Sequence, residues 1–345
     1  MNKLLSVLDK ASCGFSFVFN SYLIYLILTK SPKEFGVYKY FLVFTSVFEI
    51  AYSMLEAYLA PIHYSFGTTD LVLISTSHKT FSRFTLLVLN SIYWGFYGST
   101  LSIYAVHFIY RYLTVCKNHL IHIFNSWKFW LWLTIPLMVG IFWCFIGFYL
   151  CEPNSETEKL SKKYIFETFG EHIEHFVYLG GTVYTILKDG TIILHWKIVI
   201  GVMLMSLSII VSFSIILFCG IKCYHSIEIM MQTSSMVSSK ARSLQSQLYY
   251  ALVFQIIIPT VLLNVPLAVF FVLTLLNRGP GEYSAYLSLL ISLYPVIDPL
   301  PNFFIISAYR KAAFGCFKWN RQLSDVNQVP PNSKNLVAPA NISIK

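Results

Sequence analysis

The sequence predicts an all-α membrane protein whose core is a bundle of seven transmembrane helices. Of its 345 residues, 56% are hydrophobic and only 12% are charged, and the mean hydropathy is +0.62. In soluble domains about a quarter of the residues are charged, so this composition indicates a chain surrounded by lipid. The apolar residues also fall into stretches of about 20 or more, the length that crosses a bilayer as a helix.

Seven apolar stretches are long enough to span a membrane. They cover residues 11–29, 38–60, 84–110, 127–150, 197–221, 248–276 and 284–308. Interior prolines such as Pro259, Pro266 and Pro295 would break a soluble helix, but neighbouring helices in a membrane bundle can bond the freed carbonyl groups. We therefore expect kinks at these prolines and a single seven-helix membrane domain over residues 1–318.

Loop charges predict the orientation of the bundle. With the N-terminus outside, the inner connections and the tail hold 15 lysines and arginines against three acids, whereas the outer segments hold ten of each. Cytoplasmic loops are the ones enriched in Lys and Arg. We predict a multi-pass protein of the plasma membrane with an outer N-terminus. Its positive charge then faces membrane lipid and cytoplasmic partners, and no basic motif or aromatic platform suggests nucleic acid.

Residues 151–196 form the largest outer segment, and we predict a lid over the mouth of the bundle. The β-prone runs TVYTI and TIILHW flank Lys188-Asp189-Gly190, and Asp-Gly in this position indicates a hairpin. The preceding ETFGEHIEHFVYL has the pattern of a short amphipathic helix. An unstructured connector is the alternative.

The C-terminal part is predicted to leave the membrane. The basic and aromatic stretch YRKAAFGCF after the last span predicts a short interfacial helix, and Cys316 within it is a candidate for palmitoylation. The segment 319–345 is polar and rich in Pro and Asn, so we expect a disordered cytoplasmic tail.

The sequence lacks the patterns of a catalyst or a metalloprotein. It contains no G-x-S-x-G, no H-E-x-x-H and no Walker lysine, so we predict that it is not an enzyme. Its seven cysteines show no metal-binding spacing, and the last span holds no lysine for a retinal Schiff base. We expect no cofactor and no metal.

Three acids lie inside the predicted spans: Glu49, Glu56 and Asp298. A carboxyl group in hydrocarbon is costly and suggests function. At ~1.5 Å per residue, Glu49 and Asp298 lie at similar depth. They form either a shared site for a cation or a proton that biases two states of the bundle, or separate hydrogen bonds in a packed core. Glu56, nearer the outside, either lines a pocket or extends toward the membrane surface.

Four stretches resemble one family. The segment LYPVIDPLPNFFIISAYRKAAF resembles the seventh-helix signature of nematode serpentine chemoreceptors of the Str class, and three others fit the same class in the same order. These are NSYLIYLILTKSPKEFGVYKYFLVFTSVFEIAYSMLEAYLAPIHYSFG, FIYRYLTVC and QSQLYYALVFQIIIPTVLLNVP. The resemblance implies a rhodopsin-like olfactory receptor of sensory cilia that detects a small odorant and activates a heterotrimeric G protein. A ligand-gated channel or a small-solute transporter is the alternative that hydropathy alone leaves open.

The resemblance also implies roles for single residues. Arg111 resembles the arginine that ends the third helix of G-protein-coupled receptors, although Tyr110 replaces the usual acid. Asp298-Pro299 resembles the Asn/Asp-Pro pair of the seventh helix, and with Glu49 it forms the candidate intramembrane switch. The remaining candidates are Tyr112, Lys240 and Arg242 for G-protein coupling with Arg111, and Tyr309 and Arg310 as an anchor at the inner helix end.

We predict an apolar ligand pocket in the outer half of the bundle. Asn90, Tyr93 and Tyr97 recur on one face of the third predicted span, and Tyr286 begins the seventh. A helix-packing stripe has the same spacing and is the alternative. A ligand that binds one of two bundle arrangements better would move the inner ends of the third and sixth helices, with Pro259 and Pro266 supplying compliance.

Overall fold

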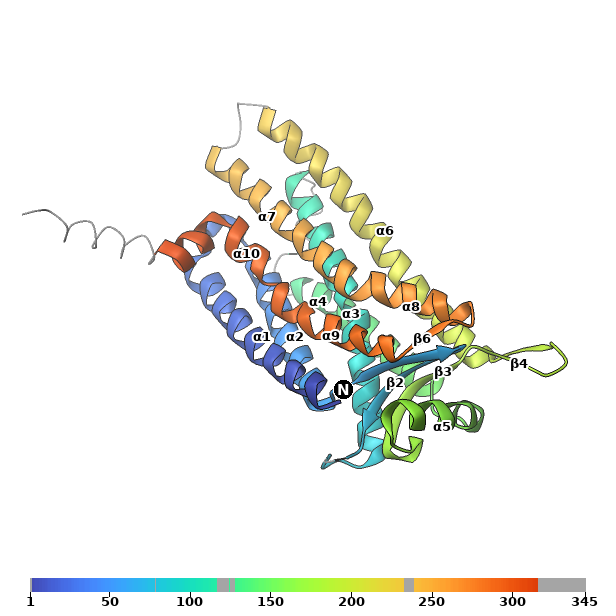
Figure 1. The fold of residues 1–345 in the computed structure, drawn as a ribbon. Coiled ribbons are helices and arrows are strands. Elements are labelled where there is room, and N and C mark those ends of the chain that lie inside the picture. The colour runs from blue at the N-terminus through green and yellow to red at the C-terminus, as the bar shows by residue number, and fades with distance from the viewer. Residues whose placement is uncertain (1, 78, 117–123, 125–127, 233–238, 316–345) are drawn as a thin grey trace, which may run out of the picture.

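The computed structural model describes residues 2–77, 79–116, 124, 128–232 and 239–315. Long helices run side by side in a bundle, and a small sheet, one further helix and a hairpin gather at one end of it (Figure 1). The N-terminus lies at this end (Figure 1). We call it the sheet end and the opposite one the far end.

The bundle helices lie where the apolar stretches lie. They are α1 (Asn2–Lys30), α2 (Tyr38–Leu59), α3 (Arg83–Val115), α4 (Lys128–Tyr149), α6 (Trp196–Gln232), α7 (Ser239–Pro259), α8 (Val265–Leu275), α9 (Ala285–Ile297) and α10 (Leu300–Ile305). Helix α6 continues to Gln232, well past the predicted end at 221. Hydropathy marks only the apolar part of a helix, whereas the polar residues that follow remain helical.

Six helical segments of the described chain have the length and hydropathy of a membrane span, and α3 is not among them. Helix α3 is long enough but carries many polar residues. It packs against α2, α4, α6 and α7, and Ser99, Thr100 and His107 are buried. A helix enclosed by other helices has little contact with lipid, so it tolerates polar side chains that a lipid-facing helix cannot.

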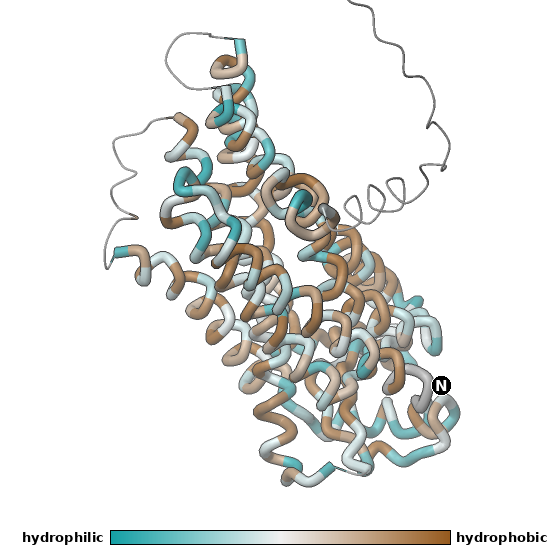
Figure 2. The backbone as a smooth tube through the Cα atoms, turned by 90° about the vertical axis from the view of Figure 1, so that its left-hand side faces the viewer, coloured by the Kyte–Doolittle hydropathy of each residue, from teal (hydrophilic) through white to brown (hydrophobic). Residues whose placement is uncertain are grey.

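The outer helices present their apolar residues outward. Large hydrophobic side chains on α1, α4, α6 and α8 are exposed, among them Phe17, Met138 and Leu217. Figure 2 shows hydrophobic residues along the bundle helices and hydrophilic ones gathering toward the ends. This distribution matches a bundle whose sides contact hydrocarbon and whose ends contact water.

Small residues bring α3 and α4 close together. A Cβ atom on Gly95 would lie 2.4 Å from Cys144 Sγ and 2.8 Å from the carbonyl oxygen of Gly140. The Ser99 hydroxyl, one turn along α3, donates to the carbonyl oxygen of Pro136 at 2.9 Å. Such small-residue contacts drive helix association in membranes, where burial of apolar surface supplies little force.

The expectation of an all-α protein was wrong at the sheet end. Strands β1 (Ile62–Gly67), β2 (Thr69–Ser75), β3 (Phe176–Thr182) and β6 (Gly279–Gly281) form an antiparallel sheet in the order β3-β2-β1-β6. Its strands come from all three connections at this end of the bundle. The sequence of such a short strand does not predict it, because the strand forms only when the tertiary structure brings its pairing partner from another loop.

The predicted hairpin is present, and the predicted lid helix was misplaced. Strand β4 (Tyr184–Ile186) pairs with β5 (Ile192–Leu194) around the Asp-Gly turn. Helix α5 covers Ser155–Phe169, earlier than expected, and begins where the Asn154 side chain accepts a hydrogen bond from the Thr157 amide. The run Phe176–Leu179, predicted as helix, lies in β3 because pairing with β2 determines its structure.

The prolines of the sixth span bracket a change of helix type. Helix α7 ends at Pro259, residues Thr260–Asn264 form one π-helical turn, and α8 follows. The Asn264 amide donates to the carbonyl oxygen of Pro259 at 3.1 Å and so satisfies a group that the altered helix leaves without its usual partner. Turns of this kind occur often at functional sites.

Candidate functional site

A cavity of about 480 Å³ lies under the sheet, within the range of small-molecule sites. Its walls come from α3, α4, α6 and the π-helical turn with α8, and its ceiling comes from β1, β2 and β3. Apolar side chains dominate the walls; Trp94, Met205, Ile209, Phe213, Leu267 and Phe271 are among them.

The two faces of the sheet have different neighbours, as the alternation along a strand requires. His63 pairs with Val72 in register, and Ser65 pairs with Asp70. His63, Asp70 and Val72 line the cavity, whereas Tyr64 packs on the other face with residues of α5. The sheet is therefore a ceiling to the cavity, and α5 forms a second layer above it.

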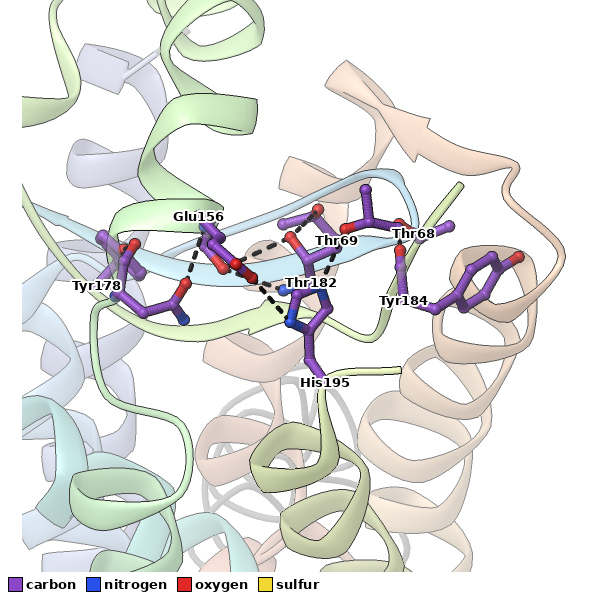
Figure 3. Close-up of polar contacts among 10 residues, drawn as sticks. Thr68, Thr69, Glu156, Tyr178, Thr182, Tyr184 and His195 are labelled. Atoms are coloured by element: carbon purple, nitrogen blue, oxygen red, sulfur yellow. Dashed lines mark hydrogen bonds and ion pairs between the residues drawn. The ribbon is translucent and has the colours of Figure 1, made fainter. Parts of the chain in front are cut away.

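A polar network joins α5, the sheet and the start of α6 (Figure 3). Thr69 and Thr182 share a hydrogen bond of 2.8 Å between β2 and β3, and the Thr68 hydroxyl donates to the carbonyl oxygen of Tyr184 at 2.6 Å. His195 Nδ1 lies 3.1 Å from the Glu156 carboxylate (Figure 3). These bonds hold the hairpin and α5 against the ceiling.

The ceiling carries two titratable side chains whose pKa values are shifted by burial. Burial raises the pKa of Asp70 to about 7 and lowers that of His63 to about 4. At neutral pH the imidazole is therefore uncharged. Cys151, at the end of α4, also lines the cavity, and burial raises the pKa of its thiol to about 12, so it remains protonated.

Two of the four predicted pocket residues line this cavity: Tyr93 and Tyr97. Asn90 is fully buried outside the lining, and its amide donates to the carbonyl oxygen of Val72 at 3.1 Å, which ties α3 to β2. Tyr286 is 62% exposed and does not line the cavity. Glu56 is buried but also lies outside the lining.

The side wall of the cavity includes residues that face away from the bundle. Ile210 on α6 and Val265 and Val272 on α8 line the cavity, and each is more than half exposed. At this wall the cavity borders the surface that contacts lipid.

The structure brings Glu49 and Asp298 together deep in the bundle. Both side chains are fully buried, and the two carboxyl groups lie within hydrogen-bonding reach of each other. The Gln255 amide on α7 donates to Asp298 Oδ2 at 3.0 Å. Tyr104 lies close to Asp298, and Asn20 and Tyr294 lie close to Glu49. We call these six residues the polar cluster.

Two adjacent carboxyl groups in hydrocarbon cannot both be ionised at low cost. Pro299, the other predicted switch residue, follows Asp298 at the break between α9 and α10. Among the described residues no group of three or more His, Cys, Asp or Glu side chains could hold a metal ion.

Arg111 is buried at the far end of the bundle and reaches from α3 to α7. Its Nη2 donates to the carbonyl oxygen of Gln245 and to Gln245 Oε1, and its guanidinium lies 5.2 Å from the ring centre of Tyr38. The other predicted coupling residues lie around this end. Tyr112 packs edge-on against Phe218, Lys240 is exposed, and Arg242 lies near the carbonyl oxygen of Met230.

The chain after α10 is helical again over residues 307–315. Tyr309 is fully buried there and shares a hydrogen bond of 2.7 Å with the hydroxyl of Ser31, in the connection between α1 and α2. Arg310 is exposed and donates to the carbonyl oxygen of Phe304 at 3.0 Å. Cys316 and the tail 319–345 lie outside the described residues.

Sequence reasoning missed His63, Asp70, Gln245 and Gln255, together with Asn20, Tyr104 and Tyr294 of the polar cluster. His63 and Asp70 lie on strands that were not predicted. The alternation of apolar and polar residues in IHYSFGTTDLVLIS was the available signal. Gln255 lies inside the predicted span 248–276, and Gln245 lies just before it; a neutral polar residue in or beside a span suggests an interior face but does not identify its partner.

Apolar helices of membrane-spanning length that enclose a ligand-sized cavity and a buried polar cluster define the architecture of a multi-pass membrane protein. The sequence model described as serpentine type 7TM GPCR chemoreceptor Str matches residues 5–314. The chain belongs to this family of seven-transmembrane chemoreceptors, which are receptors rather than enzymes.

Curated relatives match over nearly the full chain. G-protein coupled receptor str-217 of Caenorhabditis elegans is 27% identical over 337 residues, or 96% of each chain. Serpentine receptor class r-10 of the same species is 27% identical over 328 residues, or 92% of each chain. G-protein coupled receptor str-33 is 26% identical over 325 residues, 91% of this chain and 90% of the relative. The predicted family is confirmed, and the channel and transporter alternatives are set aside.

Proposed function

We propose that this chain is an olfactory receptor of a sensory-cilium membrane that binds a small odorant in the cavity and activates a heterotrimeric G protein. The cavity under the sheet is the observation that carries the proposal, since it has the size and the apolar lining of a small-molecule site. In this proposal the sheet end faces outward and the far end, with its basic connections, faces the cytoplasm. The ceiling and the segment 151–196 act as a lid within the domain 1–318.

The route for the signal is a single helix. Thr260 and Asn264, in the π-helical turn, line the cavity. Gln255 lies about 7 Å further along α7 at ~1.5 Å per residue and contacts Asp298, and Gln245 lies about 15 Å beyond Gln255 and holds Arg111. A ligand that favours one position of this helix therefore acts on the cavity, the polar cluster and the far end together.

The inner surface for the G protein follows from the same route. When the bonds between Arg111 and Gln245 break, the far ends of α3 and α7 separate and Arg111 becomes accessible. Tyr112, Lys240 and Arg242 lie beside the opening and complete the proposed contact surface. Residues 307–315, held by Tyr309, form the proposed interfacial helix that fixes the last span.

A matched pair of substitutions on α6 tests the ligand site. Val202 lines the cavity, and its neighbour Met203 is 65% exposed and does not. The screen applies small odorants to cells and reads G-protein activation. Val202→Trp should abolish the response to every active odorant, while Met203→Trp should leave it within about twofold, because only the first ring fills the cavity. Full responses from Val202→Trp at normal surface expression would exclude this cavity as the ligand site.

A further inference from the structure

Asp70 carries an unpaired carboxyl group into the cavity. It lies on β2 with its side chain on the bundle face of the ceiling, opposite Gly181 of β3 and next to Gly180. A Cβ atom on Gly180 would lie 2.2 Å from the carbonyl oxygen of Asp70, so only glycine permits this approach. Within the described part of the chain no hydrogen-bond or ion-pair partner contacts the Asp70 carboxyl group.

The cavity supplies no positive charge to this carboxyl group. Its described lining contains no lysine or arginine, and the imidazole of His63 is neutral at physiological pH. Cys151 lies close enough to Asp70 to interact with it electrostatically, and its protonated thiol carries no charge. Asp70 is half-buried, so its carboxylate is only partly hydrated, and a bound cation supplies the counter-charge that the cavity lacks.

Other polar atoms of the lining also lack hydrogen-bond partners, and each of them can accept a hydrogen bond. They are His63 Nε2, the hydroxyl oxygens of Tyr93 and Tyr97, and Asn264 Oδ1. His63 is 6% exposed and Tyr97 is 9% exposed, so water does not satisfy them freely. Buried polar atoms are normally hydrogen-bonded, and a ligand with several N–H donors would provide the missing bonds.

We propose that the cavity selects small primary alkylamines, with the ammonium group at Asp70 beneath the sheet and the alkyl chain among the apolar side chains of α6 and α8. This assignment rests on the proposed function and names its ligand class. A primary ammonium group has three N–H donors, which can pair with the Asp70 carboxylate and with unpaired acceptor atoms of the lining. An organic acid of the same length is repelled by Asp70, and an alcohol gains no charge pairing.

The pH dependence follows from the groups that face Asp70. Its carboxyl group ionises as the pH rises through about 7, whereas His63 and Cys151 do not change charge between pH 6 and 8. The phenols of the lining do not titrate there, because tyrosine ordinarily titrates near pH 10. Ionised Asp70 increases from about one tenth to about nine tenths over this range, so alkylamine affinity should rise roughly tenfold from pH 6 to pH 8.

The test uses the purified full-length chain in phosphatidylcholine nanodiscs. Octylamine, 1-octanol and octanoic acid are compared by the shift of the thermal unfolding midpoint as each is titrated. We expect octylamine to bind at least about tenfold more tightly than 1-octanol at pH 8, since a hydrogen bond between two charged groups is stronger than one between neutral groups. Asp70→Asn should abolish this preference, and Asp70→Glu should retain it. Asp189→Asn, in the exposed hairpin turn, is the matched control and should behave as the wild type.

Three outcomes would overturn the assignment of alkylamines as the ligand class. Equal or tighter binding of 1-octanol, an unchanged preference in Asp70→Asn, or no binding of octylamine would each do so. Binding of 1-octanol that Val202→Trp abolishes would reject the amine and leave the cavity as the receptor site. The G-protein screen tests the receptor function separately, so the two failures are distinguishable.

Discussion

Arg111 on α3 donates two hydrogen bonds from one nitrogen to Gln245 on α7, at 2.9 Å to the backbone carbonyl oxygen and 2.7 Å to the side-chain oxygen. The bonded pair closes the far end of the bundle. Because Gln245 is neutral, the pair is a hydrogen-bonded contact rather than an ion pair, and its strength can be changed in both directions by substitution.

Gln245→Ala should raise basal signalling. It removes the side-chain bond, and a hydrogen bond to a charged group contributes about 1.5–3 kcal/mol, enough to shift a two-state equilibrium by about tenfold or more. Gln245→Glu should lower basal signalling, because a carboxylate binds the guanidinium more strongly. Nucleotide exchange on the G protein without odorant measures both. Equal basal rates in the two variants would show that this contact does not hold the receptor in its inactive state. Arg111→Ala should abolish activation of the G protein.

The buried pair of Glu49 and Asp298 should make signalling depend on pH or sodium. Asp298→Asn leaves one carboxyl group, which no longer needs a shared proton or cation, so the dependence should weaken or disappear. Dose–response curves at several pH values and sodium concentrations measure it. Glu56→Gln, which changes a buried acid outside the polar cluster, is the control. Unchanged dependence at normal surface expression would favour simple packing.

Gly95→Ala should destabilise the bundle by about 1–3 kcal/mol, because the added methyl group forces α3 away from Gly140 and Cys144 on α4. The unfolding temperature in nanodiscs and the amount of receptor at the cell surface should both fall. Gly14→Ala is matched to it, since a Cβ atom there meets nothing within 4 Å, and it should be neutral or slightly stabilising. Equal unfolding temperatures for the two variants would show that close packing at Gly95 does not contribute to the stability of the bundle.

The proposed orientation predicts an accessible N-terminus. An epitope tag before residue 1 should stain in unpermeabilised cells, and a tag after residue 345 should stain only after permeabilisation, because the basic connections favour the cytoplasm. The reverse pattern would place the sheet inside the cell and reject the cavity as a site for external odorants.

The sequence by itself determined the elements that depend on local composition. Stretches of apolar residues long enough for a bilayer gave the bundle helices, Asp-Gly gave the β4–β5 hairpin, and the residues around Asp298-Pro299 gave the family. Each of these signals is contained within one short segment. The similar depth of Glu49 and Asp298 also followed from counting residues along two helices.

Only the tertiary structure decided which groups meet. The ceiling is built from strands in three separate connections, so its pairing depends on contacts between distant residues, and Asp70 and His63 could not be placed over the cavity from their own segments. Tyr286 has the spacing of a pocket residue and faces outward, because helix periodicity fixes a face but not what lies opposite it. The contact between Arg111 and Gln245 depends in the same way on how α3 and α7 pack.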